Sequence, residues 1–189
     1  MNSNWTLSAV EPVFRLFPED AILCGGQAVA YWAGRFQLGD VTSKDVDVVG
    51  DRDLVKALAG QKDGSAYFPH PYEMTAFCGR ATFVHAGALL EVEVLHHVPG
   101  LEDNPEEISV LVTTATGIRL RVLHPIALCQ STLSILRNFT TTQRTDRLHL
   151  EETMAPAGRG LGEMLNSDPV GTRCFQDRWL GPVRVQVKG

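Results

Sequence analysis

The chain has 189 residues, 44% of them hydrophobic, so it can bury one core with a small extension but is too short for two ordinary domains. A net charge of -5 and a pI near 5.6 argue against a protein dedicated to duplex DNA or to a membrane surface, and no apolar run approaches the ~18 residues that cross a bilayer. The four cysteines are dispersed without a CxxC pair, so we expect reduced thiols in a cytoplasmic protein.

Helical and strand patterns alternate along the first two thirds of the chain. Apolar residues recur at helical spacing from Leu7 to Phe17, and Pro18 ends the pattern. The later elements follow in chain order: strand 21–24, helix 28–36, strand 45–49, helix 54–58, a loop over 60–71, a hairpin of strands 74–85 and 88–98, a strand or hairpin over 110–122, and a helix from Pro125.

This order of elements predicts the α+β class, with a mixed β-sheet flanked by helices. We expect residues 1–123 to form the core and residues 124–189 to add a C-terminal helical extension and tail, all within one compact domain. The stretch 155–189 is rich in Gly and Pro, which is typical of a tail, here around Phe175 and Trp179.

The apolar stretch TSKDVDVVG contains two carboxylates one residue apart. Because side chains alternate along a strand, Asp45 and Asp47 are expected on one face while Val46 and Val48 point into the core. Two like charges this close raise one another's pKa unless a cation neutralises them, and Mg²⁺ prefers such oxygen ligands. The alternative is that one aspartate caps a turn and the other is a solvated strand residue.

Two further parts of a phosphate and metal site flank this pair. Upstream, Gly25 and Gly26 lead from a strand into a helix, so backbone N–H groups and the helix N-terminus can face a phosphate. Downstream, LLEVEVLHH puts Glu91 and Glu93 on one face of a strand that could lie beside the aspartates. Each part alone also fits a common turn or a solvent-exposed face, but their combination indicates a site.

The segments CGGQAVAYW, SKDVDVV and EVEVLHHVPGL resemble the signature of the nucleotidyltransferase superfamily, and with VLHPIALCQSTLSILRN they are similar to its small bacterial AbiEii-type group of toxin-related transferases. The resemblance implies a nucleotidyltransferase-like fold in which three acids act in catalysis and bind metal: Asp45, Asp47 and Glu93. Glu91 is the second choice for the third acid. It also implies a nucleotide-binding set, made up of Gly25, Gly26, Gln27, Ser43 and Lys44.

The implied reaction transfers a nucleoside monophosphate from a nucleoside triphosphate to an acceptor hydroxyl, and pyrophosphate leaves. The implied cofactor is Mg²⁺ or Mn²⁺, which would stabilise the attacking and leaving oxygens, and the third acid would bind metal or accept the hydroxyl proton. The acceptor is left open between an RNA, a protein and a small molecule. A toxin-like role would add a partner protein.

Two departures from the resemblance favour a different class of function. Thr132 stands where the relatives carry a lysine, and Val41 stands near the place where an arginine often precedes the acids. The alternative is therefore a nucleotidyltransferase-fold module that has lost catalysis and acts by binding, unless Lys44, Arg137 or Arg144 reaches the same phosphate. A glycosyltransferase that holds Mn²⁺ with its two aspartates is a third interpretation, but it leaves the glycine turn unexplained.

Overall fold

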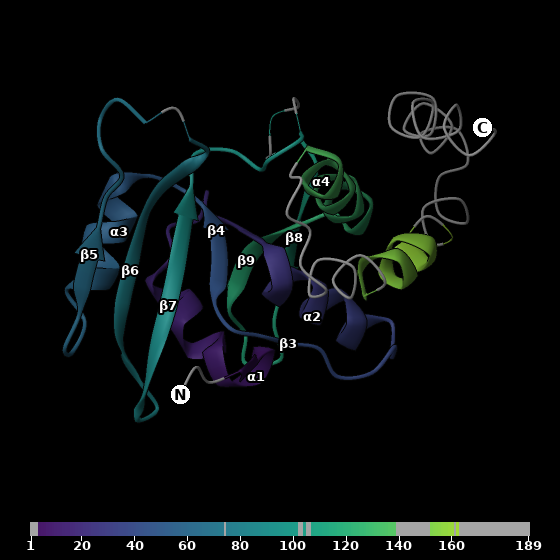
Figure 1. Cartoon of the computed structure of the whole chain (residues 1–189). Helices are drawn as coiled ribbons and strands as arrows, with labels where there is room; N and C mark the ends of the chain where they lie inside the picture. The colour runs from purple at the N-terminus through teal and green to yellow at the C-terminus, as the bar shows by residue number, and fades with distance from the viewer. Residues whose placement is uncertain are drawn as a thin grey trace.

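The computed structural model describes residues 4–73, 75–101, 104, 107–138, 152–160 and 162. These residues form a seven-stranded mixed sheet, a two-stranded sheet and flanking helices, which confirms the predicted α+β class (Figure 1). The tail predicted over 155–189 begins instead within a helical segment, 152–160, and its part beyond residue 162, with Phe175 and Trp179, lies outside the described residues, as do Arg144 and Cys174.

The large sheet has the strand order β5-β6-β7-β4-β2-β9-β8. Its strands are β2 (Ile22–Cys24), β4 (Val46–Val49), β5 (Ser65–Tyr67), β6 (Phe77–His85), β7 (Ala88–Leu95), β8 (Ser109–Thr113) and β9 (Arg119–Leu123). β4 runs antiparallel to β2 and parallel to β7, while β2 runs parallel to β9. A small antiparallel sheet joins β1 (Trp5–Thr6) to β3 (Thr42–Ser43).

The core lies under one face of the central strands. Val46 and Val48 on β4, and Val92 and Val94 on β7, are fully buried. Asp47 and Glu93, which lie between these valines, are only partly buried and project from the opposite face of the two strands. Helix α3 (Arg52–Ala59) packs against β6 and β7, whereas α2 (Gly25–Arg35) packs against β2, β4 and α4 (Pro125–Asn138) (Figure 1).

Two segments of the core also differ from the sequence predictions. The single helix expected from Leu7 to Phe17 is a short α-helix, α1 (Leu7–Val10), followed by a 3₁₀ helix, η1 (Glu11–Leu16). Pro12 lacks the N–H that an α-helix needs to continue, which accounts for the change. The loop expected over 60–71 contains the short strand β5, which pairs antiparallel with β6 and is too brief to show a periodic pattern.

Helix α4 is fixed between α2 and the loop that follows β7. Trp32 on α2 donates its indole N–H to the Leu123 carbonyl, 2.8 Å away, just before α4 begins. On the other side, the Ser131 hydroxyl donates to the Pro99 carbonyl at 2.7 Å. Gly100 has a φ of +78° and lies so close to α4 that an added Cβ would overlap the side chain of Ser134. These contacts place the middle of α4 near the end of β7.

Candidate functional site

The junction between β2 and α2 requires a glycine. Gly25 begins α2 with a φ of +57°, in the left-handed region that L side chains rarely adopt. A Cβ at this position would also lie 2.6 Å from Cγ of Asp47, well inside contact distance. The next residue, Gly26, donates its backbone N–H to the Asp47 side chain. The predicted glycine turn is therefore the first turn of the helix, and the group that it holds is the Asp47 carboxyl.

One row of paired residues crosses five strands of the sheet. Tyr67 on β5 pairs with Arg80 on β6, which pairs with Glu93 on β7. Glu93 pairs with Asp47 on β4, and Asp47 pairs with Cys24 on β2. Directly paired residues project from the same face of a sheet. The exposed fraction falls from 53% at Tyr67 to 2% at Cys24, so the row runs from an open edge to the core. The expected position of Glu93 beside the aspartates is confirmed for Asp47.

The two acids of this row lie where their charge is disfavoured. The pKa of Asp47 lies well above its ordinary value of 3.8, because the carboxyl is buried and because Asp45 and Glu93 repel its charge, while the Gly26 N–H opposes the shift. Burial and the Asp45 charge also raise the pKa of Glu93, and Arg80 partly offsets them. This is the repulsion that the sequence predicts for closely spaced acids, and a cation between them would relieve it.

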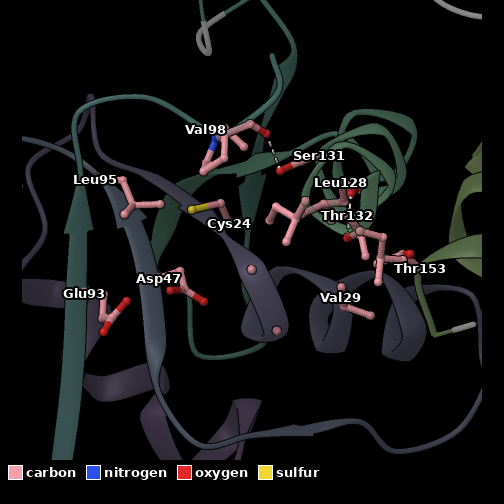
Figure 2. A pocket seen from close by; sticks show the side chains of 15 residues that line it. Cys24, Val29, Asp47, Glu93, Leu95, Val98, Leu128, Ser131, Thr132 and Thr153 are labelled. Carbon is pink, nitrogen blue, oxygen red and sulfur yellow. Dashed lines mark hydrogen bonds between the residues drawn. The ribbon is translucent and has the colours of Figure 1, made fainter. Parts of the chain in front are cut away.

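A cavity of about 290 Å³ opens beside the two acids (Figure 2). The start of α2, Asp47 and Glu93 form one side of it. Helix α4 forms the other side with Ser131 and Thr132 among apolar residues, and Thr153 of the helical segment 152–160 completes it. No Lys, Arg or His is among the described residues that line the cavity. It is therefore acidic at one end and apolar at the other, near the lower size limit of small-molecule sites.

Asp45 and the two predicted site residues before it, Ser43 and Lys44, do not line this cavity. Asp45 lies in a bend before β4, where its Oδ1 accepts a hydrogen bond from the Ser43 hydroxyl at 3.1 Å. Lys44 is exposed and makes no salt bridge with any described residue. Among the residues that the structure describes, no three His, Cys, Asp or Glu side chains are arranged to hold one ion. A metal site with all three predicted acids therefore stays a prediction.

Two other predicted site residues make contacts away from the cavity. Gln27 is fully buried, and its Nε2 donates to the Trp5 carbonyl at 3.1 Å, so its side chain joins α2 to the N-terminal strand. Glu91 forms a salt bridge with Arg80 at 2.8 Å. Glu93 is the residue that pairs with Asp47 and lines the cavity, which favours it over Glu91 as the third acid.

Sequence reasoning found Thr132 but missed Cys24. Thr132 lines the cavity from α4, and its hydroxyl donates to the Leu128 carbonyl at 2.9 Å. The sequence pattern places Cys24 only at the end of the predicted strand 21–24, but the residue also lines the cavity, and burial and the Asp47 charge raise the pKa of its thiol. Its position directly before the glycine turn was the signal in the sequence. The pairing of β2 with β4 is a long-range contact that periodicity does not reveal.

No protein-family model matches the chain, and no curated protein matches it significantly. Within the described part of the chain, no helix combines the length and the apolar composition that crossing a membrane requires.

Asp47→Asn is expected to raise the free energy of unfolding at pH 7 by about 1 kcal/mol or more, because it removes a partly buried charge that desolvation and the neighbouring acids disfavour. When folding raises the pKa of an acid, the protein loses stability as the pH rises from the pKa of that acid in the unfolded state to its pKa in the folded state. The advantage of the variant should therefore vanish near pH 4 and grow above it. Burial lowers the pKa of His124 to about 4, so the wild type and the variant both lose stability as the pH falls below 6.5. Because this loss is common to both proteins, the difference between their free energies of unfolding isolates the effect of Asp47. Urea unfolding at several pH values measures it, and a difference that is constant with pH would contradict the cause given.

Proposed function

We propose that the protein is a metal-dependent nucleotidyltransferase that moves a nucleoside monophosphate from a nucleoside triphosphate to an acceptor hydroxyl. One observation carries the proposal: the glycine start of α2, Asp47 on β4 and Glu93 on β7 converge on one cavity. They do so in the chain order of the signature that the sequence resembles. The mixed sheet gives each group a rigid position, which positional catalysis requires.

The donor set suits Mg²⁺ or Mn²⁺. Asp47 and Glu93 offer hard oxygen ligands from neighbouring strands, and burial together with repulsion by nearby acids raises the pKa of both. Magnesium is commonly held by one or two carboxylates, with waters and substrate phosphates in the other positions. Two protein ligands are therefore enough, and Asp45 would contribute through its charge rather than as a required ligand.

Each group has a role in the proposed reaction. When bound, the metal supplies charge stabilisation for the attacking and leaving oxygens. Asp47 would hold it, and Glu93 would hold it or accept the proton of the acceptor hydroxyl, a role that its raised pKa suits. Because Asp47 accepts the Gly26 N–H, the other N–H groups in the first turn of α2 would donate to a phosphate oxygen. The apolar wall of α4 offers a surface for the base.

The proposal is tested by transfer of label from α-labelled nucleoside triphosphates. The purified protein is incubated with each triphosphate and with total RNA, a soluble protein extract or a set of hydroxylated small molecules. Label should enter one acceptor class with Mg²⁺ or Mn²⁺ and not with EDTA. Incorporation that is unaffected by EDTA, or no incorporation into any acceptor class, would contradict metal-dependent transfer.

A binding module without catalysis is the second candidate, and one observation favours it. The described lining of the cavity has no basic side chain to neutralise a triphosphate, and Thr132 stands at the place of the family's lysine. Such a module would bind a metal–nucleotide complex weakly and transfer nothing. Nucleotide binding without label transfer would therefore select this candidate.

Thr132→Lys is expected to tighten triphosphate binding in the presence of Mg²⁺ by roughly ten- to a hundredfold, the effect of one added charge-assisted hydrogen bond. Thr132 already lines the cavity, so a longer side chain can extend into it. Thr132→Met is the matched control, because it adds length without charge. Equal affinities of both variants and the wild type in a calorimetric titration would show that no phosphate lies near this part of α4.

A further inference from the structure

A second cavity, of about 470 Å³, lies where α3 begins, β6 begins and β7 ends. Its lining includes Arg52 and three of the six histidines of the chain, His70, His96 and His97. Glu73 is the one acid among the described lining residues. The cavity at Asp47 and Glu93 is acidic, whereas this one gathers cationic and N–H donor groups.

Arg52 is held in place while its N–H donors stay unpaired with any described carboxylate. Its guanidinium lies over the Phe68 ring, 4.6 Å from the centroid, as in a cation–π contact. Among the described residues it makes no salt bridge. The neighbouring carboxylate, Asp51, is occupied in capping α3, where it accepts the N–H groups of Asp53 and Leu54. Arg52 is thus a positioned guanidinium available to a ligand.

The histidines lie in backbone that is fixed by hydrogen bonds. The His96 N–H donates to the Ala76 carbonyl at 2.8 Å, and the Glu73 N–H donates to the His70 carbonyl at 2.9 Å. Even a neutral imidazole offers one N–H donor. Together with the Arg52 guanidinium, the imidazole N–H groups that line this cavity are hydrogen-bond donors of the kind that suit an anion.

We propose that this cavity binds an organic phosphate of about mononucleotide size, independently of the transfer reaction proposed above. A planar guanidinium matches the geometry of a phosphate, and the imidazoles can donate to its remaining oxygens. Phe77 and two prolines give the cavity an apolar wall for the body of the ligand. Its volume falls within the usual range of small-molecule sites.

The test is calorimetric titration of the full chain with AMP, ribose 5-phosphate and inorganic phosphate, at fixed ionic strength in EDTA. AMP should bind more tightly than inorganic phosphate. Ribose 5-phosphate binding as tightly as AMP would assign the sugar phosphate as the recognised part, and weaker binding would assign the whole nucleotide. Binding of none of the probes, or equal affinities for AMP and inorganic phosphate, would overturn the proposal.

Variants locate the binding. Arg52→Met should weaken AMP binding by about tenfold or more, the loss of one charge-assisted contact. Lys56→Met is the matched control, because Lys56 is exposed like Arg52 and carries the same charge on the same helix, but it does not line the cavity and is paired with Asp53 at 2.7 Å. Glu73→Gln should tighten binding by about two- to fivefold, since it removes a like charge, and a gain of affinity does not arise from misfolding. Equal losses in the Arg52 and Lys56 variants, or an Arg52 variant that binds as well as wild type, would reject this cavity.

Discussion

Gly25→Ala is expected to destabilise the protein by about 2–5 kcal/mol, the sum of a left-handed backbone forced on an L residue and the overlap of its Cβ with the side chain of Asp47. The φ of Gly25 is +57°, and the overlap involves the carboxyl of Asp47, which is itself held by the Gly26 N–H. Relief of the overlap would displace either the start of α2 or the Asp47 side chain. Chemical denaturation of the variant measures the loss of stability.

Gly34→Ala on the same helix is the matched control. A Cβ at Gly34 meets nothing within 4 Å, and the substitution replaces a poor helix former by a good one. It should leave stability unchanged or raise it by about 0.5–1 kcal/mol. Adding Asp47→Gly to Gly25→Ala removes the overlap but not the backbone strain, so it should restore part of the loss. A Gly25→Ala protein as stable as the wild type would contradict the close approach of α2 and β4.

Asp47→Asn is expected to lower the rate of nucleotide transfer by about 10²–10⁴-fold, because it removes a charged metal ligand whose electrostatic contribution is worth several kcal/mol. Glu93→Gln should have a comparable effect, since Glu93 pairs with Asp47 across β4 and β7. The measurement is incorporation of label at saturating Mg²⁺ and triphosphate, with the acceptor class that the wild type uses.

Two controls separate this loss from unfolding and from a general change of charge. Asp47→Asn is expected to be more stable than the wild type at pH 7, so lower activity would not reflect a smaller folded fraction. Glu19→Gln removes an exposed carboxylate between η1 and β2 and should leave the rate unchanged. Full activity in Asp47→Asn would remove this residue from the proposed chemistry.

The fold was predictable where the sequence pattern is local. Alternating apolar residues predicted β4, and Val46 and Val48 are indeed fully buried while Asp47 is not. The pattern could not show that Asp45 lies in a bend outside the strand, because a polar residue at the end of a strand looks the same as one within it. Strand order could not be predicted either, since pairing between distant segments leaves no local periodicity.

The sequence predicted which residues belong to the site better than it predicted which partners their side chains contact. Gly25, Gly26, Asp47, Glu93 and Thr132 line one cavity, as their positions in the sequence suggested. Gln27 followed the glycines in sequence, but the helix turns its side chain away toward Trp5. The role of Cys24 depends on the register of β2 against β4, which only the folded chain supplies.

A metal–nucleotide site at Asp47 and Glu93 is tested by calorimetric titration of a non-hydrolysable nucleoside triphosphate into the wild type, Asp47→Asn and Glu93→Gln, each with Mg²⁺ and with EDTA. We expect weak binding by the wild type that requires Mg²⁺, and a loss of affinity of about tenfold or more in both variants, because each removes one charged ligand. Glu19→Gln should bind as the wild type does. Affinity that is the same with Mg²⁺ and EDTA, or that is unchanged in both acid variants, would contradict a metal–nucleotide site at Asp47 and Glu93.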